Sequence, residues 1–192
     1  DPNADFASNF NFTRGDVALQ WFVGDADCLV RDIWWENGLF ELQNDLKDLI
    51  FDNSQLECVV GNIQDRSSLQ SVVRRTRPDV IFHAAAFKHV PLMQDHPLEA
   101  IRNNVFGTEN IVKIAYEEGV DRFINISTDK AADPTSIMGA TKLLAERIVE
   151  SFNNLGRTSY STVRFGNVLG SHGSVVPIFS KQIASGGPVT VT

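Results

Sequence analysis

Cysteine is scarce in this chain of 192 residues, which holds two, Cys28 and Cys58. They form no CxxC pair, so the sequence indicates neither a metal site nor a disulfide framework, and a reducing, cytoplasmic location is the default expectation. No apolar run approaches the length that spans a membrane, and no signal peptide opens the chain. The net charge of -7 argues against a nucleic-acid-coating surface, although it leaves room for a local basic pocket for a phosphate ligand.

A glycine-rich turn is also missing from the first third of the chain. Residues 16–24 are compatible with a first strand, but Gly24 is followed by Asp25, Ala26 and Asp27. A dinucleotide-binding unit needs glycines there, and two carboxylates would repel a pyrophosphate. Two candidate helices follow at 25–37 and 38–50, with no strand between them that ends in an acidic residue. This third therefore does not itself support dinucleotide binding.

What the chain does have, from about residue 56, is a regular alternation of apolar and amphipathic segments. The apolar runs predict strands at 56–63, 78–86, 122–128 and 158–168, and the amphipathic runs predict helices at 65–77, 96–119, 138–156 and 175–187. Strands alternating with helices of this length predict βαβ units, hence a doubly wound α/β fold with a parallel sheet and helices on both faces.

Two of these helices carry clear periodicity and stop signals. Gly119 and Gly156 are expected to end the helices at 96–119 and 138–156, because glycine readily adopts the left-handed conformation beyond a helix end. The first of these helices should bury the apolar residues that recur at helical spacing, which are Leu98, Ile101, Val105, Ile111, Val112 and Ala115.

Polar residues gather where three of the predicted strands end. They lie at 83–88, 127–130 and 164–167. Since ligands of open α/β sheets bind at the carboxyl ends of the strands, we expect these clusters to share one rim. His83 lies inside its strand and is expected to be a hydrogen-bonded core histidine rather than an acid or base.

Four long motifs make the chain similar to a known family. Residues 83–93, 103–110, 127–142 and 164–177 resemble the CapD-like polysaccharide biosynthesis proteins. These are extended short-chain dehydrogenase/reductases, many of them nucleotide-sugar 4,6-dehydratases acting on UDP-N-acetylglucosamine. The resemblance runs from about residue 39 to 192. It implies a Rossmann-like fold, a bound and recycled NAD or NADP, and a UDP-sugar substrate in glycan synthesis.

The resemblance also shapes the expected organisation. Residues 1–15 are read as a linker or tail, and residues 16–192 as a Rossmann-like domain incomplete at both ends. The family includes longer, membrane-anchored members, so we expect an upstream anchor that would hold this domain on the cytoplasmic face of the inner membrane. Family members often self-associate, which leaves a homo-oligomer open. No metal and no nucleic acid are expected.

The resemblance implies roles for five residues in catalysis. Asp129 would be the acid for the C6 hydroxyl and Lys130 the base for C5, with Thr128 beside them. Lys142 would hold the nicotinamide ribose, and Met138 stands at a position where some members have tyrosine and others methionine. For this chemistry, burial must raise the pKa of Asp129, and burial with nearby cations must lower that of Lys130.

Binding residues follow from the same resemblance. For the cofactor they are Asn62 (an aspartate in the family), Ala84, Ala85, Ala86, Lys88, Asn104 and Lys142. For the substrate they are Lys88, His89, Arg164, Asn167 and Ser174. Two alternatives stay open. A 4-epimerase needs no acid at C6, and a non-catalytic UDP-sugar-binding module would fit the missing glycine turn.

Overall fold

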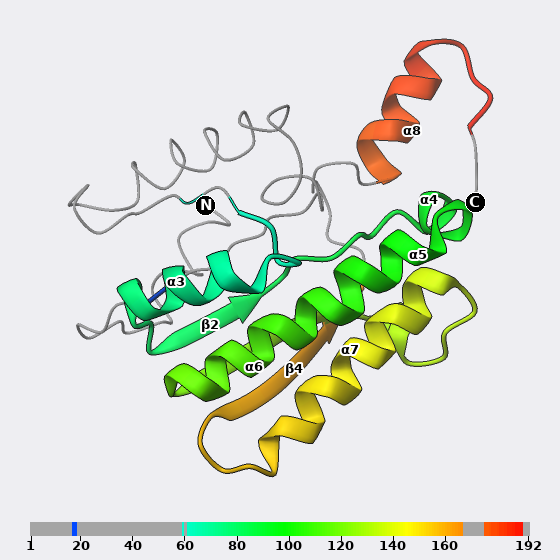
Figure 1. Ribbon diagram of the computed structural model, residues 1–192. Coiled ribbons are helices and arrows are strands. Elements are labelled where there is room, and N and C mark those ends of the chain that lie inside the picture. Colours follow the sequence, from blue (N-terminus) through cyan, green and yellow to red (C-terminus); the bar gives the residue numbers. More distant parts are fainter. Residues whose placement is uncertain (1–16, 19–58, 60, 167–174, 190–192) are drawn as a thin grey trace, which may run out of the picture.

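A parallel sheet of four strands organises the protein. The computed structural model describes residues 17–18, 59, 61–166 and 175–189 (Figure 1). The strands β1 (Val17–Ala18), β2 (Val80–His83), β3 (Arg122–Thr128) and β4 (Ser159–Phe165) lie in the order β1-β2-β3-β4, and each neighbouring pair is parallel. The predicted α/β class with a parallel sheet is therefore confirmed, and its register sets His83 beside Asn125 and Ser127 beside Arg164.

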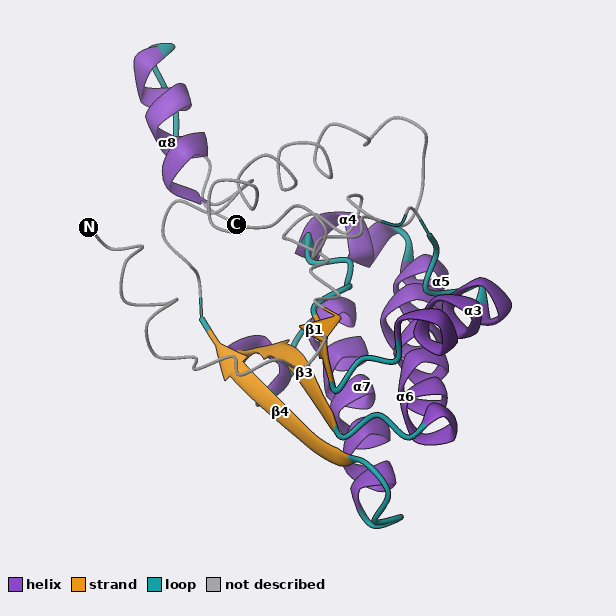
Figure 2. Ribbon diagram, turned by 90° about the vertical axis from the view of Figure 1, so that its left-hand side faces the viewer, coloured by secondary structure: helices purple, strands orange, loops and turns teal. Residues whose placement is uncertain are grey.

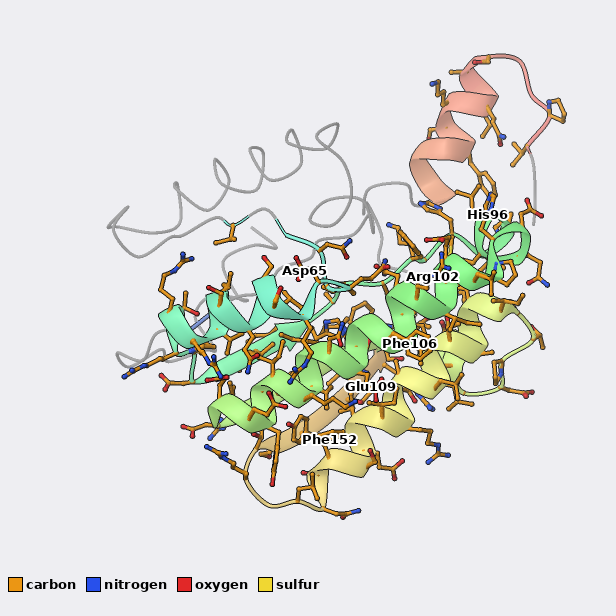
Figure 3. The ribbon with its side chains drawn as sticks, in the orientation of Figure 1. Asp65, His96, Arg102, Phe106, Glu109 and Phe152 are labelled. Carbon is orange, nitrogen blue, oxygen red and sulfur yellow. The ribbon has the colours of Figure 1, made fainter. Side chains whose placement is uncertain are left out.

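The helix α3 (Arg66–Thr76) forms where the sequence predicts it. The side chain of Asp65 accepts the backbone N–H of Ser68 at 3.1 Å, which supplies one of the missing partners at the helix start (Figure 3). Arg74 and Arg75 occupy the last turn, where the helix dipole favours positive charge. The helix ends at Arg77, whose backbone is left-handed with φ of 44°.

The predicted helix at 96–119 forms as three joined segments. These are α5 (Pro97–Ala100), the π-helical η2 (Ile101–Gly107) and α6 (Thr108–Glu118), preceded by the short α4 (Val90–Asp95). Gly119 ends the run with φ of +74°, as predicted. Burial of Leu98 is wrong, because this side chain is 66% exposed. The wider turns of η2 shift the apolar stripe, so Leu98 does not continue the buried face of α6, whereas Ala100 of α5 is buried.

The strand after α6 has the predicted bounds, and the helix that follows it ends earlier than predicted. β3 spans the predicted residues 122–128, and the short 3₁₀ helix η3 (Asp129–Ala131) follows it directly. The helix α7 (Ile137–Asn153) starts at Ser136, whose hydroxyl accepts the N–H of Gly139 at 3.1 Å. It ends three residues before Gly156, which takes φ of +73° in the turn toward β4.

Some predicted elements are shorter or lie outside the described residues. Residues 84–86 are loop rather than strand, and Val59 and Gly61–Ile63 of the predicted strand 56–63 are loop and turn. The predicted helix at 175–187 forms as α8 (Val175–Ala184). The predicted helices at 25–37 and 38–50 lie outside the described residues. Among the described helices, no segment has the length and apolar character needed to cross a membrane.

The main core lies between the sheet and the helices on one of its faces. The side chains of Ile81, Phe123 and Tyr160 come from β2, β3 and β4 and pack in one cluster with buried residues of α3, α6 and α7. Figure 2 shows α6 and α7 on the same side of the strands. Full burial of one such side chain contributes about 1.5–3 kcal/mol, so this layer fixes the strand ends relative to the helices. A helical layer on the opposite face stays a prediction.

Candidate functional site

The predicted acid–base pair lies on a tight turn at the carboxyl end of β3. The hydroxyl of Thr128 donates to Asp129 Oδ1 at 2.8 Å, and its oxygen accepts the backbone N–H of Lys130 at 3.4 Å. The ammonium of Lys130 contacts the same carboxylate oxygen at 3.1 Å. The structure therefore brings the hydroxyl, the carboxylate and the ammonium into one hydrogen-bonded group, as adjacent residues on a 3₁₀ turn allow.

In this structure the pKa of the Asp129 carboxyl is lowered, whereas its predicted role as an acid needs the pKa to be raised. Hydrogen bonds from Thr128 and from Lys130 hold the pKa of the Asp129 carboxyl below its usual range, and desolvation opposes them less strongly. The side chains of Lys130 and Asp129 are 41% and 59% exposed. Because water solvates both groups, the rim lacks the dry environment that would raise the carboxyl pKa. Such a rise requires a ligand to cover the turn.

Two glycines bring neighbouring elements close to this turn. A Cβ on Gly139 would lie 2.5 Å from the carbonyl oxygen of Lys130 and 3.2 Å from Pro134 Cβ. A Cβ on Gly166 would lie 3.6 Å from Asp129 Oδ2. The start of α7 and the end of β4 therefore both pack against the Asp129–Lys130 turn, which places two of the three predicted polar clusters together.

Lys142 lies buried beneath the turn. Its ammonium donates to the main-chain oxygen of Ile126 at 2.7 Å, and the residue is 6% exposed. Burial lowers the pKa of Lys142 to about 8, while the negative charge of Glu146 opposes that shift. Lys142 is therefore not an exposed helix lysine. Its burial and its lowered pKa fit the predicted role of a cation next to a cofactor.

An ionic cluster with a buried carboxylate and a partly exposed guanidinium lies near Lys142, and sequence reasoning missed its centre, Glu146. Glu146 accepts the hydroxyl of Ser127 and takes the guanidinium of Arg164 with both oxygens, at 2.9 Å from Nε and 2.5 Å from Nη2. Two signals pointed to it: the i, i+4 spacing of Lys142 and Glu146, and the positions of Ser127 and Arg164 near two strand ends. Arg164 faces α7 here, and its binding of substrate diphosphate stays a prediction.

Asn104 holds the loop after β2 in place. Its side-chain oxygen accepts the N–H of Phe87 at 2.7 Å, and its amide donates to Phe87 O and to Thr141 Oγ1, both at 3.1 Å. The residue is 1% exposed and lies in the π-helical η2, an irregularity often found at functional sites. Its amide is thus used on the protein's own backbone, and its contact with cofactor stays a prediction.

The other loop residues after β2 have mixed environments. Ala85 is buried, Ala84, Ala86 and Lys88 are partly buried, and His89 is exposed just before α4. The side-chain oxygen of Asn62 accepts the N–H of Gln64 at 2.8 Å, so the atom predicted to face an adenine already has a partner. Asn167 and Ser174 lie outside the described residues.

Met138 and His83 are both core residues. Met138 is 4% exposed and packs with Met93 and Ala100 in a second apolar cluster, so it faces protein rather than a ligand. His83 is confirmed as a core histidine. Its Nε2 lies 2.8 Å from the hydroxyl of Thr108, and burial, with Lys142 nearby, lowers its pKa to about 3. The described residues contain no cluster of His, Cys, Asp and Glu that could hold a metal.

Comparison with known proteins finds a matching family and several similar proteins. The family described as polysaccharide biosynthesis protein matches residues 32–192. The capsular polysaccharide biosynthesis protein CapD of Staphylococcus aureus is 46% identical over 82% of this chain and 26% of its own length. A UDP-N-acetylglucosamine 4,6-dehydratase (inverting) of Campylobacter jejuni is 40% identical, over 74% of this chain and 44% of its own.

Two further matches bear on function and fold. A UDP-glucose 4-epimerase of Rickettsia massiliae is 37% identical over 78% of this chain and 44% of its own length. The X-ray structure of Pen from Bacillus thuringiensis superposes with a TM-score of 0.74 at 38% identity, covering 82% of this chain and 49% of that one. The chain thus spans less than half the length of each of these relatives.

Proposed function

The chain belongs to the polysaccharide biosynthesis protein family, and on that premise we propose that it carries the catalytic turn of an NAD(P)-dependent nucleotide-sugar 4,6-dehydratase. The substrate would be UDP-N-acetylglucosamine or a similar UDP-sugar, as the name of the Campylobacter relative suggests. The carrying observation is the group formed by Thr128, Asp129 and Lys130 at the end of β3, with Lys142 buried beneath it. Self-association and a place on the cytoplasmic face of a membrane stay predictions.

The described part of the cofactor site is compatible with a nicotinamide nucleotide. Residues 84–86 are alanines with no atoms beyond Cβ, and Ala84 and Ala86 are partly exposed, so their side chains would let a ligand lie close to the backbone after β2. Lys142 makes one hydrogen bond within the described residues, to Ile126, and would hold the nicotinamide ribose with its other N–H donors. A nicotinamide held there by Lys142 would supply the hydride chemistry between C4 and C6 of the sugar.

The hydrogen bonds of the turn suggest how the protons move. Lys130 would act as the base that takes the proton from C5, which the C4 ketone makes acidic; C5 is protonated again at the end, and Lys130 releases the proton that it took. Asp129, protonated, gives its proton to the C6 oxygen, which leaves as water. Thr128 donates to Asp129, so it can pass the proton of the O4 hydroxyl to that carboxylate. The O4 proton then leaves in the water, and both side chains return to their starting states.

The test uses UDP-N-acetylglucosamine and NAD⁺ in deuterated water, with mass spectrometry of the product. A dehydratase gives a 4-keto-6-deoxy sugar that has lost one water. Lys130→Ala and Asp129→Asn should each lower kcat by about 10²–10⁴-fold, because each removes an acid–base group. Unchanged substrate after incubation with folded protein, or full activity of Lys130→Ala, would contradict this proposal.

A 4-epimerase is the second candidate, because a UDP-glucose 4-epimerase is among the relatives. Epimerisation at C4 leaves the product mass unchanged and needs no acid at C6. Asp129→Asn would then keep most of its activity, whereas a dehydratase would lose it. The third candidate, a non-catalytic UDP-sugar-binding module, would bind UDP but not NAD⁺ in calorimetry.

A further inference from the structure

Glu146 is the point where three elements meet beneath the site. It projects from α7, and its oxygens take the guanidinium of Arg164 from β4 and the hydroxyl of Ser127 from β3. The residue is 8% exposed. A buried carboxylate is stable when a positive charge and hydrogen bonds compensate for its lost hydration. Arg164 and Ser127 provide these for Glu146.

The contacts of Glu146 reach residues that adjoin the catalytic turn. Ser127 directly precedes Thr128, and Arg164 lies two residues before Gly166, which packs near Asp129. Lys142, one helical turn before Glu146, adds a hydrogen bond to Ile126 O on β3. Through these bonds α7 fixes the ends of β3 and β4 relative to each other at the level of the turn.

Opposing effects set the pKa values of Glu146 and of its neighbour Lys142. Burial by itself would raise the pKa of Glu146, but hydrogen bonds from Arg164 and Ser127, with the charge of Arg164 and Lys142, hold it below its usual value. Glu146 in turn opposes the effect of burial on Lys142. His83 on β2 also feels the charge of Lys142. Burial and that charge lower the pKa of His83 to about 3, so its ring is neutral at neutral pH. Glu146 is therefore the counter-charge that favours protonated Lys142.

We propose that Glu146 is a positioning residue for the reaction, which holds the ends of β3 and β4 through Ser127 and Arg164 and keeps Lys142 positively charged. The proposal rests on the proposed function in one respect, the role of Lys142 beside the cofactor. It also gives Arg164 a defined task as the partner of Glu146, distinct from the predicted contact with substrate diphosphate.

The test measures the titration of Lys142 and the kinetics in parallel. Glu146→Gln keeps the size of the side chain and removes its charge, whereas Glu150→Gln makes the same change one turn later in an exposed pair with Arg147. In NMR spectra of the lysine Cε–Hε groups, Lys142 should titrate near pH 8 in the parent protein and at lower pH in Glu146→Gln. Glu150→Gln should leave the titration unchanged.

Kinetics then separate positioning from substrate binding. Glu146→Gln should lower kcat by about 10-fold or more while KM for the UDP-sugar changes little, because the altered groups act on the turn rather than on the nucleotide. Glu146→Asp should restore the Lys142 titration in part, since it keeps the charge.

Each outcome has a definite meaning. An unchanged Lys142 titration in folded Glu146→Gln would overturn the proposal, whatever the activity. Full kcat in folded Glu146→Gln would contradict its positioning role. If the parent protein dehydrates no UDP-sugar, the proposed function fails, but the titration still decides whether Glu146 holds the charge of Lys142.

Discussion

The acid–base groups of the candidate site differ in burial, and different causes shift their pKa values. Asp129 is exposed, and its hydrogen bonds lower its pKa, so it is ionised at neutral pH in this structure. Lys142 lies below the surface, and burial lowers its pKa to about 8. If Asp129 is the general acid, as proposed, it must gain its proton during the reaction, and the hydrogen bond from Thr128 offers a route for that proton.

Gly139 is required by the close packing of the turn on α7. Changing Gly139 to alanine should destabilise the protein by about 1–3 kcal/mol, because its Cβ would overlap the carbonyl of Lys130, which is main chain and cannot rotate away. Lower kcat should accompany the loss, as Lys130 moves. Urea unfolding and NMR shifts of residues 128–131 measure both effects.

The control for this change is Gly61→Ala. A Cβ at Gly61 meets nothing within 4 Å, so we expect its stability to change by about 0.5 kcal/mol or less. Equal stabilities of Gly139→Ala and the parent protein would mean that the turn adapts at no cost, and the packing argument would fail.

At the scale of elements, the π-helical η2 orients two kinds of side chain in opposite directions. Asn103 and Asn104 are buried, whereas Arg102 and Phe106 are exposed on the outer side of the helix (Figure 3). The inward turn of η2 aims Asn104 at the loop after β2, whose backbone it pairs at Phe87. The irregular helix therefore sets the position of the loop that borders the predicted cofactor site.

Asn104→Ala should lower the free energy of unfolding by about 2–3 kcal/mol. The change leaves the N–H and the carbonyl of Phe87 without their partners, and each unsatisfied group costs about 1–3 kcal/mol when buried. Denaturant unfolding measures the loss. Hydrogen exchange at Phe87 should also become faster, which a general loss of packing would not confine to this loop.

Asn110→Ala serves as the comparison on the neighbouring helix. Asn110 donates to the carbonyls of Ile63 and Gln64, and its removal should cost about 1 kcal/mol without faster exchange at Phe87. If both variants behave alike, the loop does not depend on Asn104 in particular.

At the scale of the molecule, polar side chains fill part of the layer between sheet and helices. His83, Asn125 and Ser127 project from the strands toward α6 and α7, where Thr108 and Glu146 meet two of them. The layer is apolar around Phe123 and polar near the strand ends. Stability therefore depends on pH through groups that the fold keeps in one protonation state.

His83 should make the protein less stable in acid. Its pKa is about 3 in the fold and 6.5 as the ordinary value, so between these values the unfolded chain binds a proton that the folded chain does not. The contribution of neutral His83 to the free energy of unfolding is fully present above about pH 6.5 and is lost as the pH falls toward 3. The expected loss between pH 7 and pH 5 is about 2 kcal/mol.

Urea titrations at pH 7 and pH 5 measure this loss in two variants. His83→Gln removes the titrating ring and should show a smaller difference between the two pH values, even if it is less stable at both. His96→Gln, at an exposed histidine, should retain the full difference. A His83→Gln difference as large as that of the parent protein would place the acid sensitivity in other groups.

Much of the described fold could be predicted because its signals are local. The helix after Asp65, the strand at 122–128 and the stop at Gly119 each depend on a few neighbouring residues, and all three are confirmed. Burial of Leu98 and a helix end at Gly156 failed, because the π segment and the turn after Asn153 depend on packing. The roles taken from the family resemblance stay predictions, since they concern ligands.

The sequence by itself determined the order of strands and helices, the parallel sheet and the collection of polar residues at the strand ends, because periodicity and chain order carry that information. Only the tertiary structure decided which charges meet. Glu146 pairs with Arg164 across 18 residues, and Asp129 is ionised because Thr128 and Lys130 donate hydrogen bonds to its carboxylate. Charge state depends on burial and on neighbours from distant parts of the chain, which no local pattern in the sequence contains.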